Sequence, residues 1–301
     1  MTTVAYVPAR LTGGAGHLLD LYVPSGETSL RPLIIWSGGS AWKRDDGKAS
    51  AASIAKVFNA KGYAVAGVSV RSSDQALFPA QVFDIKAAIR WLRAHAADHR
   101  LDPDRFAIMG DSSGGWLAGM AAVTGDVADL EGSLGTTGVS SRVQVAVPFF
   151  GPSDFLRMNA QRPSASALDH DTPDSPESRL IGCAIQTCPE AVARANPITY
   201  VDAGSPPMLL LHGQADVLVP HGQSVILYHA IRDRGGDAMF ISVPGAGHGT
   251  AAVMSPSRFG SQTVYTTRDG HETVTTGSPD PTWDTVDAFL RRALNVSPGL
   301  R

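Results

Sequence analysis

The residue best suited to covalent chemistry in this sequence is Ser112, at the centre of Gly110-Asp111-Ser112-Ser113-Gly114. An apolar run precedes this pentapeptide and a helix-forming run follows it, so the pentapeptide is predicted to be a tight turn between a buried strand and a helix. A serine at such a turn exposes its hydroxyl at the end of the sheet, provided that both flanking positions are small. Ser113 is a poorer nucleophile candidate, because Asp111 would then occupy one of those small positions.

A serine hydroxyl needs a general base, and the sequence offers a histidine and an aspartate on later loops. Asp216 follows the strand predicted over residues 208–212, and His248 lies in a glycine-rich loop after the strand predicted over 238–243. The order serine, acid, histidine and the two loop positions predict that Asp216 orients His248 and that His248 takes the proton of Ser112.

The other histidines of this region are weaker candidates for the base. His212 ends a predicted strand, which favours a structural role, and His221 and His229 fall within the predicted helix that follows. Asp111, next to the nucleophile, is in the wrong place to be the acid.

The negatively charged oxygen that forms during attack on a carbonyl needs N–H donors. The first is predicted to be the Ser113 amide, at a helix N-terminus that favours negative charge. Further donors are expected from the loop after the strand at residues 33–37, where Gly39 and Ser40 offer their amides.

The elements that must position these residues alternate along the chain, as in a mostly parallel sheet with crossover helices. The predicted strands are residues 19–23, 33–37, 64–70, 106–110, 143–149, 208–212 and 238–243. The predicted helices are residues 51–61, 80–97, 113–124, 221–234 and 281–294. The fold class is therefore α/β, and residues 1–301 are interpreted as one domain.

Two segments interrupt this alternation and are expected to flank the catalytic edge of the sheet. Residues 151–206 are rich in Pro, Ser and Asp, which predicts a lid-like insertion. Residues 250–280 form a polar insertion, whose threonines around Asp269-Gly270 indicate a hairpin. Cys183 and Cys188 in the first insertion are either a small loop disulfide or two reduced thiols, and no further ligand at suitable spacing suggests a metal site.

Composition narrows the range of functions. The 301 residues carry a formal net charge of −3 with scattered basic side chains, which argues against a nucleic-acid partner. No apolar run is long enough to cross a membrane, and no secretory signal is visible, so a cytoplasmic protein is expected, although a trimmed secreted form would look the same. The expected partner is a small-molecule ester; a homo-oligomer is left open, and the chemistry calls for no cofactor.

Several motifs give the sequence a resemblance to the bacterial feruloyl- and acetylxylan-esterase-like branch of the α/β-hydrolases, near the hormone-sensitive-lipase-like esterases. Besides the serine pentapeptide, the supporting segments are Phe78-Pro79-Ala80-Gln81, Leu101-Asp102-Pro103-Asp104-Arg105, Ser175-Pro176-Glu177-Ser178, Ala195-Asn196-Pro197-Ile198-Thr199-Tyr200 and Pro244-Gly245-Ala246-Gly247-His248-Gly249. The resemblance covers residues 33–248 and implies an α/β-hydrolase fold and a serine carboxylesterase.

The oxyanion loop departs from the pattern of this family. Relatives carry His-Gly-Gly-Gly-Trp, whereas aligning their tryptophan with Trp42 places Gly38 at the histidine position. The chain therefore lacks the imidazole that helps to hold this loop in relatives.

The substrate is predicted more coarsely than the reaction. Short-acyl esters are the broader expectation, with Trp42, Trp116, Phe149 and Phe150 as candidate walls for a feruloyl group. A peptidase, an acyltransferase and a non-catalytic ligand-binding homologue are the alternative functions.

Overall fold

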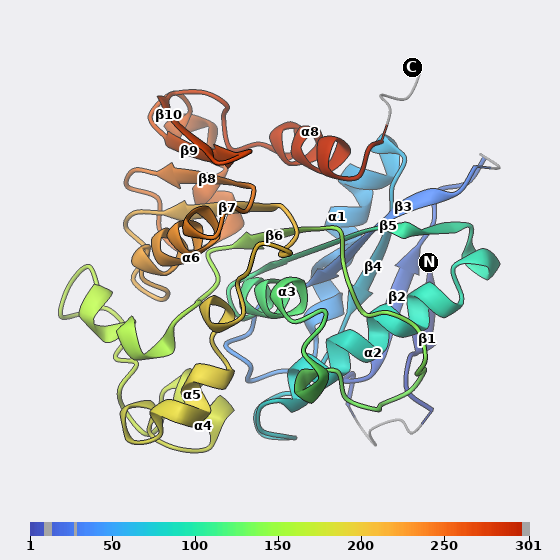
Figure 1. Ribbon diagram of the computed structural model, residues 1–301, viewed down its shortest axis with the longest axis horizontal. Helices are drawn as coiled ribbons and strands as arrows, with labels where there is room; N and C mark the ends of the chain where they lie inside the picture. The colour runs from blue at the N-terminus through green and yellow to red at the C-terminus, as the bar shows by residue number, and fades with distance from the viewer. Residues whose placement is uncertain (9–13, 27–28, 297–301) are drawn as a thin grey trace.

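The computed structural model describes residues 1–8, 14–26 and 29–296, and its ten strands belong to one sheet (Figure 1). The strand order is β1-β2-β4-β3-β5-β6-β7-β8-β9-β10. The six strands from β4 to β8 in this order run parallel, while β1, β2, β9 and β10 are antiparallel to their neighbours. The strands are Thr2–Ala5, Leu18–Tyr22, Arg31–Ser37, Ala64–Val68, Leu101–Asp111, Val145–Phe149, Met208–Gly213, Ala238–Val243, Thr263–Arg268 and His271–Thr276, numbered β1 to β10 in that order.

Helices cover both faces of the sheet and bury it in two apolar layers. Helices α2 (Ala80–Ala94), α3 (Ser113–Val123) and α6 (Gly222–Asp233) contribute to one layer, and α1 (Ala51–Phe58) and α8 (Trp283–Ala293) contribute to the other. In α3 every residue is buried, because this helix also lies beneath the insertion that follows β6. Because the central strands are parallel, their carboxyl ends lie at the same edge of the sheet. The helices on the two faces pack against these strands.

The predicted strands and helices are confirmed, with shifts of a few residues at their ends. The largest differences are that β5 begins earlier than predicted, at Leu101, and that α1 and α2 each end three residues earlier, at Phe58 and Ala94. The short edge strand β1 was not predicted, since four partly exposed residues carry little alternation of apolar and polar side chains.

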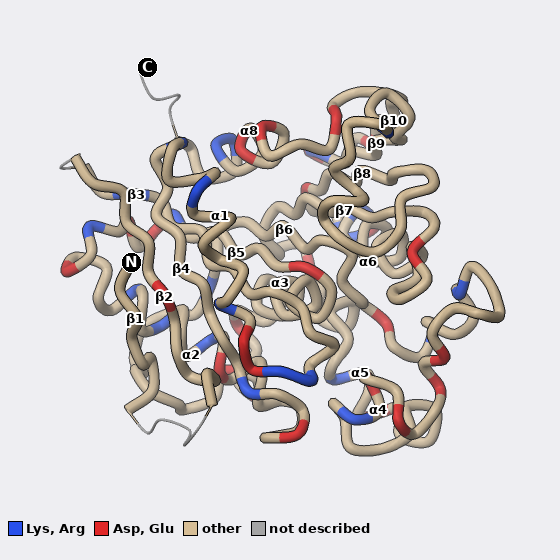
Figure 2. Tube along the Cα trace, turned by 180° about the vertical axis from the view of Figure 1, so that it is seen from behind, with Lys and Arg blue, Asp and Glu red and all other residues tan. Residues whose placement is uncertain are grey.

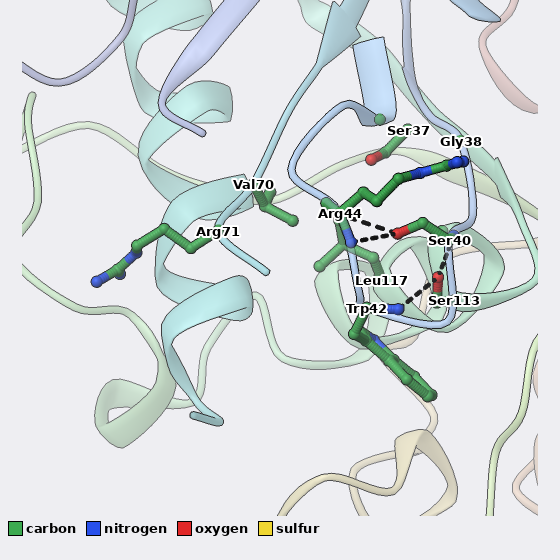
Figure 3. A pocket seen from close by; sticks show the side chains of 11 residues that line it. Ser37, Gly38, Ser40, Trp42, Arg44, Val70, Arg71, Ser113 and Leu117 are labelled. Carbon is green, nitrogen blue, oxygen red and sulfur yellow. Dashed lines mark hydrogen bonds between the residues drawn. The ribbon is translucent and has the colours of Figure 1, made fainter. Parts of the chain in front are cut away.

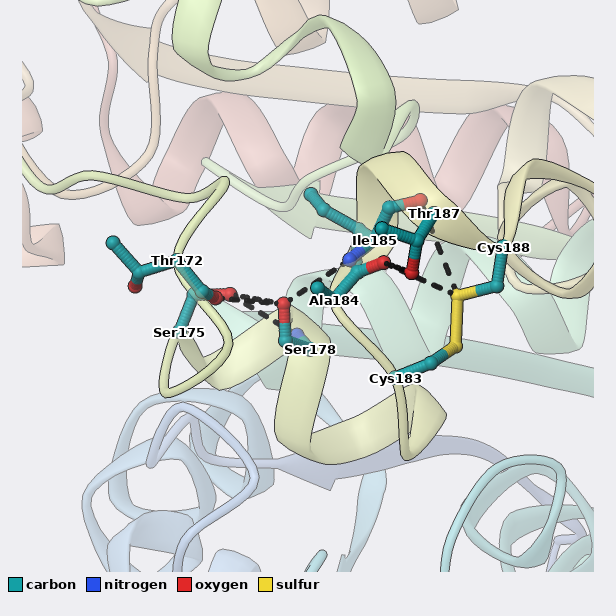
Figure 4. Close-up of a disulfide and its surroundings, with 8 residues drawn as sticks. All are labelled: Thr172, Ser175, Ser178, Cys183, Ala184, Ile185, Thr187 and Cys188. Atoms are coloured by element: carbon teal, nitrogen blue, oxygen red, sulfur yellow. Dashed lines mark hydrogen bonds between the residues drawn. A yellow bond between two sulfur atoms is a disulfide. The ribbon is translucent and has the colours of Figure 1, made fainter.

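Residues 151–206, the segment predicted to be a lid-like insertion, lie between β6 and β7 and contain no strand. They form α4 (Pro176–Ile181), α5 (Pro189–Arg194) and short 3-10 turns. A disulfide joins Cys183 to Cys188 between these two helices, which settles the alternative left open by the sequence (Figure 4). Beside it, the Ser178 hydroxyl donates to the Thr172 carbonyl at 2.8 Å, and the Ile185 amide donates to the same hydroxyl at 3.3 Å. The insertion is thus cross-linked internally.

The hairpin predicted around Asp269-Gly270 is confirmed as β9 and β10, but its position differs from the expectation. Strand β9 pairs antiparallel with β8, with Ser242 opposite Thr263 and Ala238 opposite Thr267. The hairpin therefore extends the sheet sideways, and its turn lies at the edge opposite the carboxyl ends of the parallel strands. Within residues 250–280, the helix α7 (Thr250–Val253) is the part that directly follows the His248 loop.

Charged residues of both signs are interspersed along the chain (Figure 2). Among the described residues, no helix is both long and apolar enough to span a membrane.

Candidate active site

Ser112 occupies a sharp turn between β5 and α3. Its backbone has φ 55° and ψ −124°, a combination that a residue with a side chain adopts only at a cost. The turn closes because Gly110 and Gly114 lack side chains: a Cβ on Gly110 would lie 2.6 Å from the Ser37 carbonyl oxygen, and one on Gly114 would overlap the same oxygen. The predicted strand-turn-helix context of Ser112 is therefore confirmed.

The variant Gly114→Ala is expected to destabilise the protein by about 2 kcal/mol or more, because the new methyl group must push the turn away from β3. Urea unfolding followed by circular dichroism would measure this. Gly119→Ala is the matched control in the same helix, since its Cβ would lie 3.5 Å from Pro197, an ordinary contact. Equal free energies of unfolding for both variants would contradict the steric argument.

His248 and Asp216 come together at the edge where Ser112 is exposed. His248 Nδ1 lies 2.7 Å from Asp216 Oδ2, and the imidazole keeps 18% of its surface accessible whereas the carboxylate is fully buried. Burial by itself raises the pKa of Asp216, but hydrogen bonds from His212 and His248 outweigh it and hold the pKa well below the usual aspartate range. Asp216 is therefore a carboxylate at neutral pH.

His212 is a partner of this carboxylate that the sequence argument assigned only a structural role. Its Nε2 lies 3.0 Å from the Val219 carbonyl oxygen and 3.3 Å from Asp216 Oδ2, and its Nδ1 lies 2.8 Å from the Ser224 hydroxyl. Because a carbonyl oxygen only accepts, Nε2 carries the proton and Nδ1 accepts from Ser224. His212 and His248 thus both contact Asp216 Oδ2.

His221 is excluded as the base by its surroundings. It was predicted to begin a helix, but α6 starts one residue later, at Gly222, so His221 immediately precedes this helix. Its Nε2 lies 2.9 Å from the Ser242 hydroxyl. Burial, together with the neighbouring His212, lowers the pKa of His221 to about 4. It is a neutral, structural imidazole.

The loop predicted to supply the oxyanion donors has a different hydrogen-bond pattern from the expectation. The Gly39 amide donates to Asp111 Oδ1 at 2.8 Å, and the Ser40 amide donates to the Ser113 hydroxyl at 2.9 Å. Both predicted loop donors are therefore already engaged. The amides of Ala41 and Ser113 make no hydrogen bond within the part of the chain that the structure describes.

Ala41 is the residue of this loop that the sequence argument missed. Ala41 and Trp42 both have positive φ, 53° and 56°, which is unusual for residues with side chains and marks a constrained loop. Gly38 at the histidine position of the family pattern indicates that this loop is unusual. Which of its amides is free to bind an oxyanion depends on hydrogen bonds to Asp111 and Ser113, far away in the sequence.

The Ser113 hydroxyl anchors the same loop (Figure 3). It accepts from the Ser40 amide at 2.9 Å and from the Trp42 amide at 3.4 Å, so one side chain of α3 holds two amides of the loop. Ser113 therefore anchors this loop to α3.

The variant Ser113→Ala is expected to lower kcat on a short ester by about tenfold with little change in KM, because the loop that bears Ala41 loses its two hydrogen bonds to the Ser113 hydroxyl. Steady-state kinetics would test this, with the exposed Ser133→Ala as control. A rise in KM at unchanged kcat would instead indicate that the loop contributes only to substrate binding.

A cavity of about 320 Å³ connects the reacting groups with the lid-like insertion. Ser112, Ser113 and His248 line it together with Ala41 and Trp42. Its other lining residues are Lys43, Pro152, Leu168, Asp169, Thr172, Asp174, Ser175, Pro176, Glu177, Leu218 and Val219. The insertion at residues 151–206 thus forms one wall of the candidate active site.

The predicted aromatic walls are wrong except for Trp42. Trp116 is fully buried, its Nε1 donates to the Ala195 carbonyl at 2.7 Å, and its ring packs edge-on against Trp42 at 5.4 Å. Phe149 and Phe150 are also fully buried, and Phe150 packs against His248 at 4.7 Å. These rings support the site from the apolar layers, where aromatic residues near strand ends contribute more by packing than by contact with a ligand.

No cluster of three or more metal-ligating side chains occurs among residues 1–8, 14–26 and 29–296.

Known proteins are similar to this chain in sequence and in fold. The family model BD-FAE matches residues 19–231, more than half of the chain. The probable carboxylic ester hydrolase LipM of Mycobacterium tuberculosis is 30% identical over 221 residues, which cover 70% of this chain and 48% of that protein. The chain thus spans about half the length of this curated relative.

Two solved structures are similar in fold and sequence. A truncated form of a carbohydrate esterase from gut microbiota has a TM-score of 0.75 and 38% identity, covering 82% of this chain and 89% of that one. A bifunctional GH43-CE protein of Bacteroides eggerthii has a TM-score of 0.79 and 34% identity, covering 96% of this chain and 34% of that one. The chain therefore has the α/β-hydrolase fold and belongs to the BD-FAE family.

Proposed function

We propose that this chain hydrolyses carboxylic esters through an acyl-enzyme on Ser112. The observation that carries the proposal is the 2.7 Å contact between His248 Nδ1 and Asp216 Oδ2 at the cavity that Ser112 also lines. The curated relative named as a carboxylic ester hydrolase and the solved carbohydrate esterase support the same reaction class.

In the first half of the reaction, the Ser112 oxygen bonds to the ester carbonyl carbon while its proton passes to His248. Since Nδ1 of His248 faces Asp216, Nε2 is the nitrogen that takes the proton. The carboxylate of Asp216 stabilises the imidazolium. The carbon–oxygen bond to the alcohol then breaks, and the alcohol leaves with the proton from Nε2.

In the second half, water replaces the alcohol. His248 takes a proton from the water as its oxygen attacks the acyl carbon, and the proton returns to Ser112 when the acid leaves. The negative charge that develops on the carbonyl oxygen in both halves is bound by the amides of Ser113 and Ala41, which are without acceptors among the described residues and line the cavity.

A short acyl group suits the cavity better than a feruloyl group. Within the described residues, Trp42 is the only Trp, Tyr or Phe that lines it, since Trp116, Phe149 and Phe150 are buried. An acetyl group needs no aromatic wall. The aromatic ring of a ferulate would be in contact with Trp42 alone, which gives it little apolar surface to pack against.

The test is a fluorophosphonate probe combined with an ester panel. We expect one covalent adduct per chain on the peptide that contains Ser112, by mass spectrometry, and turnover of p-nitrophenyl acetate that disappears as the adduct forms. No labelling of Ser112 would favour a non-catalytic homologue. Faster turnover of a matched amide than of the ester would favour a peptidase, and acyl transfer to added alcohols in preference to water would favour an acyltransferase.

A further inference from the structure

A buried glutamate of the lid-like insertion faces the same cavity as Ser112 and takes no part in the reaction proposed above. Glu177 lies in the first turn of α4, and its side chain is only 4% exposed. It lines the cavity together with Thr172 and Trp42. A carboxylate buried to this extent must be held by specific partners.

One oxygen of Glu177 is held by a buried histidine. Glu177 Oε2 lies 2.9 Å from His170 Nδ1, which donates to it because a carboxylate only accepts. His170 is itself fixed, since its backbone N–H donates to Asn159 Oδ1 at 2.8 Å. The Glu177 carboxylate is therefore fixed in orientation before any substrate enters.

The other oxygen of Glu177 is available. Oε1 makes no hydrogen bond with any described residue, and it does not belong to the polar atoms that are sealed from solvent without a partner. Because the residue lines the cavity, this oxygen presents a fixed acceptor to whatever the cavity holds. A pre-oriented acceptor binds a donor without losing side-chain entropy.

The charges around the cavity indicate which donor is suited. Asp169, Asp174 and Glu177 line it together with a single cation, Lys43, so an anionic ligand is disfavoured. The charge of Glu177 is already shared with the Nδ1–H of His170, and one free oxygen matches one O–H donor. A neutral hydroxyl also costs less to remove from water than a cation does.

We propose that Glu177 accepts a hydrogen bond from a hydroxyl group of the substrate, so that the site prefers acetate esters of polyhydroxylated alcohols to those of alcohols without free hydroxyls. This inference rests on the proposed ester hydrolysis for its reaction, and it adds a specificity-determining residue to it.

The variant Glu177→Gln tests the acceptor directly. The Gln amide must turn its oxygen to His170 Nδ1–H, which places the NH2 group where Oε1 stood and replaces a charged acceptor by a neutral donor. Glu190→Gln, at an exposed position of α5 in the same insertion, is the matched control.

The substrates are a monoacetate of methyl xylopyranoside and the same ester with its two free hydroxyls converted to methyl ethers. We expect the native protein and Glu190→Gln to prefer the free-hydroxyl ester by about tenfold in kcat/KM, mostly through KM. In Glu177→Gln this preference should shrink to near unity.

Three results would overturn the inference. An unchanged preference in Glu177→Gln would remove Glu177 from recognition, and an equal loss on both esters would leave it a structural role. A preference for acetylcholine over the free-hydroxyl ester that disappears in Glu177→Gln would show that Glu177 recognises a cation and not a hydroxyl group. If Glu177→Gln does not fold, the native protein alone still tests the inference. Equal kcat/KM values of the native protein on the two esters would contradict it.

The inference can fail separately from the proposed function. If no ester is turned over, the two esters are compared by calorimetric binding to the native protein and to Glu177→Gln. Loss of discrimination in Glu177→Gln would then support the recognition role although the proposed reaction had failed. Equal binding of the two esters to the native protein would overturn it.

Discussion

The variant Ser112→Ala is expected to lower kcat on p-nitrophenyl acetate by at least about 10⁵-fold, because Ser112, which lines the cavity, forms the acyl-enzyme in the proposed reaction. The Ser113 hydroxyl cannot substitute, since it already accepts from the amides of Ser40 and Trp42. Initial rates at high enzyme concentration would measure the remaining activity.

The fold should survive this change. Alanine has the same backbone preferences as serine at the strained φ of 55°, and no hydrogen bond of the Ser112 side chain is lost within the described residues. A midpoint of thermal unfolding equal to that of the native protein, together with full activity of Ser133→Ala, would show that the loss is chemical. Activity within tenfold of the native protein would contradict Ser112 as nucleophile.

The variant Asp216→Asn is expected to lower kcat by about 10⁴-fold, because it forces His248 into the wrong tautomer. Oδ1 of Asp216 accepts from the amides of Leu218 and Val219, both at 2.9 Å, so the amide oxygen of Asn must occupy this position. Its NH2 group then replaces Oδ2, 2.7 Å from His248 Nδ1. Nδ1 can only accept from NH2, which moves the imidazole proton to Nε2, where it blocks transfer from Ser112.

The same exchange also places the NH2 group against the Nε2–H of His212, 3.3 Å from Oδ2. We therefore expect a measurable loss of stability as well as of kcat, by about 1–3 kcal/mol for the mismatched donors. Asp98→Asn, at an exposed position after α2, is the control for both measurements. Retention of more than a tenth of the native kcat would indicate that Asp216 does not orient the base.

Acidification should remove the stabilising effect of Asp216. Its pKa is lower in the folded than in the unfolded chain, so its contribution is fully present above the unfolded value and declines as the pH falls through the folded value. The free energy of unfolding, measured as a function of pH, should therefore fall on acidification, and this loss should be smaller in Asp216→Asn.

Local patterns were sufficient for most of the fold and for placing the three residues of the proposed reaction at one edge of the sheet. Strands and helices follow from apolar periodicity, and Ser112 follows from the small residues that a strand-turn-helix junction requires. Asp216 and His248 could be predicted because parallel strands end at the same edge, so loops far apart in sequence meet there.

The hydrogen bonds around these residues could not be predicted in the same way. Gly39 and Ser40 have amides of the right kind, but whether an amide is free depends on Asp111 and Ser113, which lie more than 70 positions away along the chain. Trp116 was taken for a wall because a large aromatic near a strand end can face either a cavity or a layer. Only the packing of the lid-like insertion over α3 decides that it is buried.

The sequence by itself determined the α/β fold class, the turn that exposes Ser112, and the placement of Asp216 and His248 on neighbouring loops, because each depends on neighbouring residues or on the order of strands. Tertiary structure decided which amides remain free, which aromatic residues are buried, that β9 and β10 extend the sheet away from the catalytic edge, and that Glu177 faces the cavity. These are contacts between segments that no local pattern brings together, and their energies depend on geometry that only the packed chain supplies.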